Sequence, residues 1–481
     1  MITPIGLALF VIMGCFLVLA RRHFIWFLAA MIPFPQVAMF VVAGQGISPF
    51  YAAAIPATFM GVSATLKAML RDRGSFKPIR GPQARLLALF ATYAVLVSVI
   101  GPILFEGVGV FSPRLGINDQ LVRQTPLAFT ISNFAQIMYL LLGLGVIVYV
   151  LSLPHLPPRI LETGIWVGLL FTFINALYLQ AGLAFPREFF DTIPTIYYQA
   201  GGRLRGPFAE PSVLGAFLTA SVAYLAHRAI VNTGRARVTA VVGIVVGLWE
   251  YVLSASGTAL AGLGIVAVIA ILISFTKWVS AGAPGIDRLS IIALALLATV
   301  IAFWARVAGF TAELVSDKLV SDSYSDRTGA DQYALTLVLK TWGIGVGLGS
   351  NRPSSLGAML LSCVGIVGTG LLIVLVIRAA LRTRALGSEY AGSAWALLGV
   401  SIAMAIAKAD LATPMIWMAL AFCMYVSTYG GDSKPHDFTP GPLPPASHRG
   451  SGRLASRTHE ALGHERRRRA GSIGTATTDL E

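Results

Sequence analysis

Charged side chains are scarce in this chain of 481 residues: Asp, Glu, Lys and Arg make up 12%, against 56% hydrophobic residues. Soluble globular proteins carry about 25% charged residues. This composition cannot supply the polar surface that a soluble chain of this length needs, which excludes the soluble classes. We expect a polytopic membrane protein built from α-helices, because a helix satisfies its own backbone hydrogen bonds in lipid.

Cysteine and histidine are also scarce. The three cysteines, Cys15, Cys363 and Cys423, lie in apolar segments without metal-ligand spacing, so they indicate neither a disulfide framework nor a metal site. None of the seven histidines falls in a loop that the charge pattern places outside. Catalysis by an imidazole on the outer side is therefore not expected.

Hydrophobic runs of spanning length, about 20 residues, recur along the chain. We expect about thirteen spans, within a range of about 12–14, near 4–20, 24–43, 49–69, 86–105, 128–151, 162–183, 211–228, 238–254, 257–275, 289–308, 355–377, 392–408 and 412–428. The first should be a retained helix, because no small-residue cleavage site follows the basic residues at 21–23. The predicted fold class is an all-α transmembrane bundle with two large periplasmic loops.

Positive charge predicts the orientation, since Lys and Arg concentrate in cytoplasmic loops. Here they concentrate in alternate connections, at 21–22, 71–85, 159, 228–237, 277–288 and 378–384. Placing these inside puts the N-terminus in the periplasm, the C-terminus in the cytoplasm, and the long loops 184–210 and 309–354 outside. The formal charge of +14 is then explained by topology and anionic lipid rather than by nucleic acid.

The chain beyond residue 428 has a different composition. It is rich in proline at 435–445 and carries a basic run at Arg466–Arg469. Such a segment cannot bury an apolar core. We expect a membrane domain at 1–428 and a disordered basic cytoplasmic tail at 429–481.

The densest polar stretch is 201–212, which contains Arg203 and Arg205. Together with Arg327 and Arg352 of the other long outer loop, these cations lie where the topology disfavours them. Arginine stays charged and donates two parallel hydrogen bonds to phosphate oxygens, so the four residues are candidates for holding a diphosphate. The alternatives, that long loops tolerate charge and that outer arginines pair with lipid headgroups, stay open at this point.

Glu210 precedes Pro211, which can occupy the first position of a helix. A carboxylate at this boundary can cap the helix, or it can act as a general base that takes a proton from a sugar hydroxyl. Other ionisable groups in or near spans are Glu250, Lys408 and Asp410. For these we expect structural or supporting roles.

The second long loop contains an amphipathic pattern followed by glycines. Gln332, Thr336 and Lys340 recur every four residues within 328–342, which predicts a helix at the membrane face. The run at 343–349 does not follow a strand, so it is better suited to close backbone approach to a ligand or a helix than to nucleotide binding. Candidate substrate-binding residues are Arg203, Lys340, Gly343, Gly345, Arg352 and Ser354.

These features resemble the O-antigen ligase/polymerase superfamily, and the resemblance covers about residues 1–428. Wzy-type polymerases are described by the spacings R-x10-G and R-x15-G in two periplasmic loops. Arg327 and Gly343 match the second spacing, whereas Arg205 and Gly215 are one residue short of the first.

WaaL-type ligases of the same superfamily carry the pattern H-[NSQ]-x9-G-x2-G-T. The chain keeps this frame at Ser354, Ser355, Gly365, Gly368 and Thr369, but Ser354 stands at the histidine position. A serine hydroxyl is not a competent base near neutral pH. The resemblance therefore favours the polymerases over the ligases.

The resemblance implies a GT-C-like membrane glycosyltransferase that polymerises undecaprenyl-diphosphate-linked oligosaccharide repeat units of O-antigen, capsule or exopolysaccharide. The reaction would take place at the periplasmic face of a bacterial inner membrane. Arg205, Glu210 and Arg327 are the expected catalytic residues: the arginines, with Arg203, would hold the diphosphate without a metal or other cofactor, and Glu210 would be the base.

The expected partners are the lipid-linked oligosaccharide, membrane lipids, a chain-length regulator and a flippase, but not nucleic acid. Two alternatives stay open. One is a glycan ligase that uses a base other than histidine. The other is a transporter whose pathway is lined by Glu250, Lys408 and Asp410.

Overall fold

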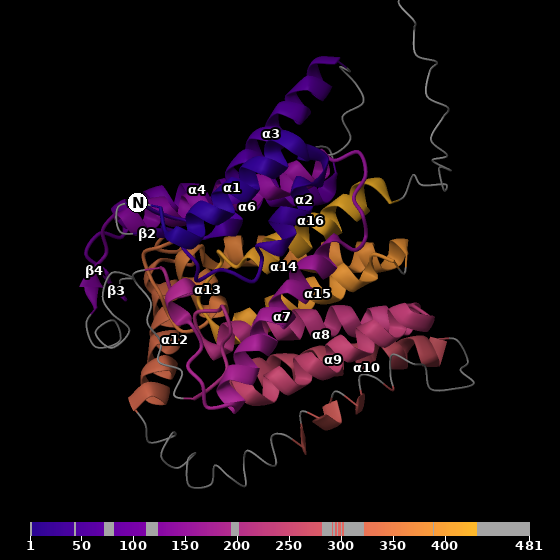
Figure 1. Cartoon of the computed structure of the whole chain (residues 1–481). Coiled ribbons are helices and arrows are strands. Elements are labelled where there is room, and N and C mark those ends of the chain that lie inside the picture. The colour runs from indigo at the N-terminus through magenta and orange to yellow at the C-terminus, as the bar shows by residue number, and fades with distance from the viewer. Residues whose placement is uncertain are drawn as a thin grey trace, which may run out of the picture. The chain divides into compact units, whose positions relative to one another are not determined.

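The computed structural model describes residues 2–42, 45–71, 81–111, 124–193, 202–280, 322–387, 389–430 and part of 291–302. These residues belong to one compact unit, Met1–Ser433, and are mostly helical (Figure 1). The helices are α1 (Pro4–Leu19), α2 (Phe24–Ala30), α3 (Pro49–Arg71), α4 (Pro82–Leu104), α6 (Ile131–Leu151), α7 (Ile160–Gln180), α8 (Pro211–Val231), α9 (Gly234–Ser254), α10 (Gly257–Ser280), α12 (Asp322–Lys340), α13 (Leu356–Cys363), α14 (Gly365–Leu386), α15 (Ala391–Ala407) and α16 (Pro414–Tyr429).

Two small antiparallel sheets and two 3-10 turns complete the described elements. Strand β1 (Phe40–Val42) pairs with β2 (Gln45–Ile47), and β3 (Gly109–Val110) pairs with β4 (Thr125–Pro126). The turns are η1 (Arg21–His23) and η3 (Arg187–Phe189). The expected tail at 429–481 and most of the expected span 289–308 lie outside the described residues.

Membrane-spanning character is evident in the described helices. Seven of them, α3, α4, α6, α7, α8, α9 and α14, are long and apolar enough to cross a membrane. Helices α1 and α2 pass the same test together but are bent by 119°, and three shorter apolar helices lie in α10, α15 and α16. The expectation of a helical multi-pass membrane protein is supported, although the described residues contain fewer uninterrupted spans than the hydrophobic runs of the whole chain predict.

The core of the bundle is formed by helices that are apolar on all sides. Nearly every residue of α8 and α16 is buried. By contrast, α3, α4 and α9 expose large apolar side chains such as Phe59, Ile103 and Val245. Exposed apolar surface of this extent suits helices that face lipid, so α8 and α16 lie at the centre and α3, α4 and α9 at the periphery.

The predicted helical span 24–43 is wrong in its second half. Helix α2 ends at Ala30, and the chain continues in irregular and extended form to β1. Pro33 and Pro35 explain the break, because proline removes a backbone donor and restricts the preceding residue. The extended part is buried at Ile32, Phe34 and Val37–Met39, as non-helical backbone at membrane depth must be.

The predicted span 355–377 is also broken. Helix α13 ends at Cys363 and α14 begins at Gly365, whose φ of +64° lies in the left-handed region. Gly365 packs directly against the backbone of the glycine run, because a Cβ added to it would lie 2.1 Å from the carbonyl oxygen of Gly343. The close approach needs glycine, and it splits one apolar run into two helices.

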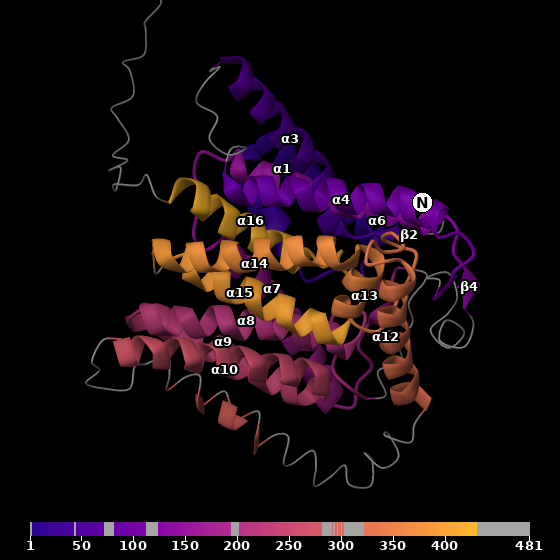
Figure 2. The ribbon, with the colours of Figure 1, turned by 180° about the vertical axis from the view of Figure 1, so that it is seen from behind.

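The amphipathic helix expected at 328–342 is present as the C-terminal part of α12. Ala330, Ala334 and Leu337 are buried, whereas Gln332 and Thr336 are exposed. Helix α12 crosses one end of the bundle at a steep angle to α8, α14 and α15 (Figure 2).

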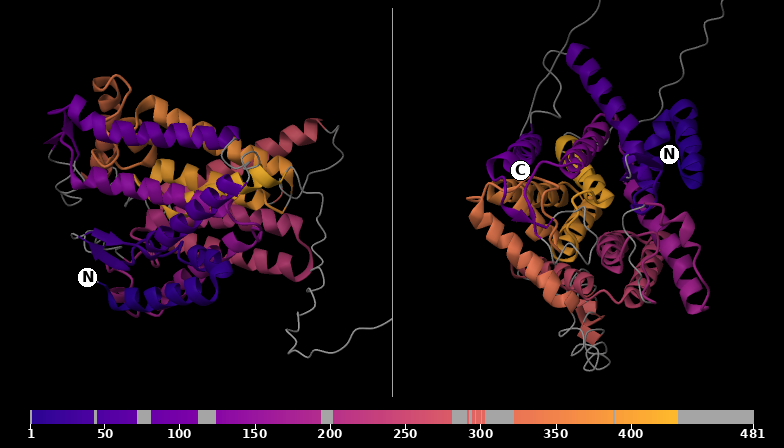
Figure 3. Two further views of the ribbon diagram at one scale, coloured as in Figure 1. Left: turned by 90° about the horizontal axis from the view of Figure 1, so that it is seen from above. Right: turned by 90° about the vertical axis from the view of Figure 1, so that its left-hand side faces the viewer.

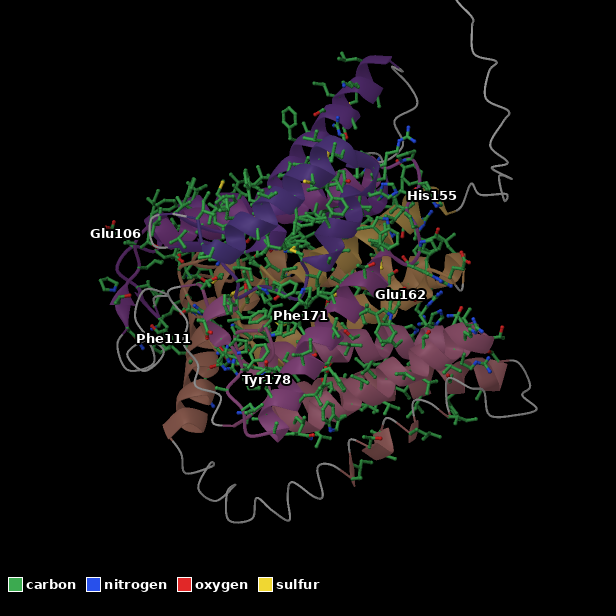
Figure 4. All side chains as sticks on the ribbon, viewed as in Figure 1. Glu106, Phe111, His155, Glu162, Phe171 and Tyr178 are labelled. Carbon is green, nitrogen blue, oxygen red and sulfur yellow. The ribbon has the colours of Figure 1, made fainter. Side chains whose placement is uncertain are left out.

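The bundle has two ends. We name the end that contains Glu106 and Phe111 the cavity end, and the end that contains His155 and Glu162 the basic end (Figure 4). Two hydrogen bonds connect segments at the basic end. The hydroxyl of Tyr429 donates to the carbonyl of Leu151 at 2.8 Å, and the hydroxyl of Tyr224 donates to the carbonyl of Pro158 at 3.4 Å. Which membrane side each end faces stays a prediction.

Candidate functional site

Residues at the cavity end enclose a cavity of about 200 Å³. Helix α12 and the two small sheets lie at the same end of the bundle (Figure 3). The walls of the cavity come largely from non-helical segments that interrupt or join the helices. They include Pro35 and Gln36 of the broken second span, Ser48 after β2, Phe208 and Ala209 of the 201–212 stretch, Gly349, Asn351 and Arg352 at the end of the glycine run, and Lys408–Asp410 and Ala412–Thr413 between α15 and α16. Backbone breaks at this depth are tolerated where they line a cavity.

Four helices begin at this cavity. First-turn residues of α3 (Tyr51), α6 (Ser132), α8 (Val213) and α16 (Pro414) all line it. The N-terminus of a helix carries a partial positive charge and unpaired backbone N–H groups. Their convergence makes the cavity favourable for an anion.

Two cationic side chains, Arg352 and Lys408, add to this field, and the carboxylate of Asp410 lies among them with the opposite charge. Within the described part of the chain, Arg352 has no carboxylate partner at ion-pair distance. Its guanidinium therefore keeps its hydrogen-bonding capacity for a bound group.

Lys408 is the C-cap of α15 and is only 8% exposed. Its Nζ lies 3.5 Å from Oε1 of Glu210, the N-cap residue of α8. Ser212 donates a hydrogen bond of 3.2 Å to the other oxygen of Glu210. Glu210 thus lies behind Lys408 and holds it, while no hydrogen bond from its side chain caps the helix.

Within the described residues, one carboxylate oxygen of Asp410 accepts a hydrogen bond, and the other does not. Its Oδ1 accepts a hydrogen bond of 2.8 Å from the backbone nitrogen of Ala412, which forms a turn into α16. Its Oδ2 accepts no hydrogen bond from any residue that the structure describes. A carboxylate that lines a cavity with one such oxygen can accept a hydrogen bond or a proton from a hydroxyl group.

Neutral polar and aromatic side chains form the remaining wall. Gln36, Gln136, Tyr51 and Tyr139 line the cavity, and the two tyrosine rings pack edge to face with centroids 4.7 Å apart. Amide groups beside aromatic rings are suited to a ligand with hydroxyl groups and apolar ring faces. The cavity therefore combines an anion-binding part with a part suited to such a ligand.

Arg352 is held in place by contacts between two loops at the cavity end. Its backbone nitrogen donates to the carbonyl of Phe111 at 3.0 Å, and the side-chain oxygen of Asn351 accepts from the nitrogen of Phe111, also at 3.0 Å. Tyr333 of α12 donates to the carbonyl of Gly109 at 2.7 Å. These bonds fix the backbone that carries Arg352.

The glycine run contacts neighbouring backbone, not an open cradle. Positive φ values occur at Gly345 (+101°) and Gly349 (+82°), where an added Cβ would lie 2.5 Å from the carbonyl oxygens of Cys363 and Ser132, respectively. Backbone nitrogens of Val346 and Gly347 donate to carbonyls of α13. The interpretation of close backbone approach to a helix is confirmed for these glycines.

Arg205 is buried and paired with an acid. Both guanidinium ends bond to the carboxylate of Asp191, and Nη1 donates to the carbonyl of Phe208 at 3.0 Å. Arg205 does not line the cavity, but Phe208 does. Arg205 therefore lies behind the cavity wall, and its contact with Phe208 fixes the turn 205–208 that contributes to this wall.

The other predicted residues are spread over the same end of the bundle. Arg203 donates to the carbonyls of Ser254, 3.1 Å, and Ala255, 2.9 Å, at the end of α9. Lys340 lies over the ring of Tyr333, 5.1 Å from its centroid, and the backbone nitrogen of Ser354 donates to Asp331 at 2.7 Å. Arg327 belongs to α12, and its side chain lies outside the described part.

The expected cluster of Arg203, Arg205 and Arg352 around one ligand is thus not formed. Of the predicted site residues, Arg352 lines the cavity and Glu210 reaches it through Lys408. Sequence reasoning assigned Lys408 and Asp410 supporting roles and did not identify Gln36. The signals were available: an ionisable pair in a short connection between two spans, and a glutamine after two prolines in an apolar run.

No protein-family model and no curated protein sequence matches the chain. The resemblance to the O-antigen ligase/polymerase superfamily therefore rests on the motifs in the sequence.

Proposed function

We propose that the chain is a membrane glycosyltransferase that polymerises undecaprenyl-diphosphate-linked oligosaccharides, with its active site in the cavity beside Arg352, Lys408 and Asp410. The single observation that carries this proposal is the cavity itself. It combines a lysine and the N-termini of four helices with a guanidinium that has no acid partner, and a carboxylate that has one open oxygen, among the residues the structure describes. These are the groups needed to bind a diphosphate and to deprotonate a hydroxyl.

Arg352 and Lys408 would neutralise the diphosphate of the donor. In the reaction, the hydroxyl oxygen of the acceptor sugar forms a bond with the anomeric carbon of the donor sugar. The bond from that carbon to the diphosphate oxygen breaks, and its electron pair leaves with the diphosphate. Fixed positive groups stabilise the charge that develops there.

Asp410 would accept the proton of the acceptor hydroxyl through its open oxygen. This assignment differs from the expectation for Glu210, because the carboxylate of Glu210 pairs with Lys408 and Ser212. Glu210 would instead position Lys408. General bases of this kind contribute about 10²–10⁴-fold to the rate.

The size of the cavity limits what it would hold. At about 200 Å³ it is smaller than typical ligand pockets of roughly 300–1,000 Å³. It would take the diphosphate and the reacting sugar, while the rest of the oligosaccharide and the prenyl chain lie outside it. The site would therefore select the reacting end of its substrate.

Deletion of the gene in the native host tests the proposal. A polymerase predicts that single lipid-linked repeat units accumulate and long polymer disappears. A ligase instead predicts that long lipid-linked polymer accumulates. An unchanged profile of lipid-linked glycans would contradict both.

One observation favours a transporter as the second candidate. Discontinuous spans that line a central site are typical of secondary transporters, and both the broken second span and the break between α15 and α16 line the cavity. Reconstituted uptake of a solute that depends on Lys408 and Asp410, with no glycosyl transfer, would support this candidate.

A further inference from the structure

A second cavity, of about 240 Å³, lies beside the C-terminal end of α7. Asn175, Arg187 and Arg203 supply its polar groups, and Leu179, Leu183 and Phe185 supply apolar ones. None of these residues lines the cavity beside Arg352. The mechanism proposed above makes no use of them.

Arg187 brings a positive charge to this cavity. Its Nη1 is buried and has no hydrogen-bond partner among the described residues. The two acids that follow it in the chain are Glu188, which is exposed, and Asp191, both oxygens of which bond to Arg205. Burial, together with the neighbouring charge of Arg205, lowers the pKa of Arg187, although Asp191 opposes this shift.

Asn175 offers a second donor. It is 3% exposed, and its Oδ1 accepts a hydrogen bond of 3.1 Å from the backbone nitrogen of Gly206. Its amide nitrogen donates to no residue in the described ranges. A guanidinium and an amide N–H₂ on one cavity wall are complementary to an anion with several oxygens, such as a phosphate.

Apolar side chains continue from the cavity over the surface of α7. Leu170 and Leu177 are exposed at a spacing of two helical turns, and Leu183 and Phe189 are exposed beyond the end of the helix. An aliphatic chain could lie along this surface while its headgroup enters the cavity. A polar cavity next to an exposed apolar surface suits a membrane lipid, because a free ion would not contact the apolar side chains.

We propose that Arg187 and Asn175 form a binding site for the phosphate group of a membrane lipid, separate from the cavity beside Arg352. The phosphate could belong to an anionic phospholipid or to a polyprenyl phosphate, which share this chemistry. The site does not depend on the proposed glycosyltransferase activity.

Native mass spectrometry of the purified full chain tests the site. Phosphatidylglycerol and undecaprenyl phosphate are titrated separately, with phosphatidylcholine as the zwitterionic reference. Arg187→Ala removes the guanidinium, and Asn175→Asp keeps the acceptor for Gly206 while it replaces the N–H₂ donor by a carboxylate. Arg382→Ala, an exposed arginine near the end of α14, is the matched control.

Arg187→Ala and Asn175→Asp should each weaken binding of at least one anionic lipid about tenfold, as expected for a lost charge-assisted hydrogen bond. Arg382→Ala should leave it unchanged. The lipid that loses affinity identifies the source of the phosphate. Equal lipid binding by both site variants and the wild type would overturn the proposal, as would inorganic phosphate competing as well as the lipids do.

Discussion

The Nζ of Lys408 lies 3.5 Å from Oε1 of Glu210, and this pair joins the end of α15 to the start of α8 beside the cavity. The side chains are 9% and 15% exposed. Removing one partner of such a pair leaves a poorly solvated charge, which costs more than the pair contributes. The contact therefore bears on stability and on the position of Lys408.

Glu210→Gln should lower the free energy of unfolding by about 1–3 kcal/mol, since it leaves Lys408 unpaired. Adding Lys408→Met to this variant should recover part of the loss, because no charge then remains at the contact. A double-mutant cycle by thermal denaturation in detergent measures the coupling. Strictly additive effects of the two substitutions would argue against the ion pair.

Asp410→Asn should reduce glycosyl transfer about 10²–10⁴-fold if Asp410 is the base. The amide oxygen can still accept from Ala412, so the turn before α16 and the melting temperature should change little. Single-turnover assays with lipid-linked substrate provide the rate. A normal rate in Asp410→Asn together with a large loss in Glu210→Gln would return the role of base to Glu210.

Arg205→Ala should destabilise the protein by about 3–5 kcal/mol, because it strands the carboxylate of Asp191, whose side chain is 10% exposed. Replacing both partners, Arg205→Met with Asp191→Leu, should restore much of the melting temperature. If Arg205 instead bound substrate directly, Arg205→Ala would abolish activity without changing the melting temperature.

Gly349→Ala should also destabilise the fold, since its φ is +82° and the new Cβ would lie 2.5 Å from the carbonyl oxygen of Ser132. Gly370→Ala is the control, because no atom lies within 4 Å of the Cβ position there. In that helix interior, alanine should stabilise by up to about 1 kcal/mol. Comparable melting temperatures for the two variants would contradict the close approach at Gly349.

Much of the helical fold follows from the sequence, because long apolar runs leave helices as the way to satisfy the backbone. The breaks were harder to predict. Pro33 and Pro35 signalled the first, but the extended chain beyond Ala30 is stabilised by contacts with distant residues, such as that of Ala38 with Thr192 at 2.6 Å. The break at Gly365 depends on its contact with Gly343, which no local pattern reveals.

The site was predictable only in part. Residue type made Arg205 and Arg352 equal candidates for binding a phosphate. They differ in the structure because Arg205 is paired with Asp191, whereas Arg352 lines the cavity. Such pairing depends on how a loop folds back on itself. Lys408 and Asp410 reach the cavity because α15 ends where α8 begins, a juxtaposition of segments almost two hundred residues apart in sequence.

The most direct test of the central claim is the release of undecaprenyl diphosphate by the purified chain, supplied with undecaprenyl-diphosphate-linked oligosaccharide in nanodiscs. Arg352→Ala should release it at least about tenfold more slowly than the wild type, because a charge-assisted contact to the leaving group is lost. Arg382→Ala, at the opposite end of the bundle, should match the wild type. Equal rates for Arg352→Ala and the wild type would contradict the assignment of the diphosphate to this cavity.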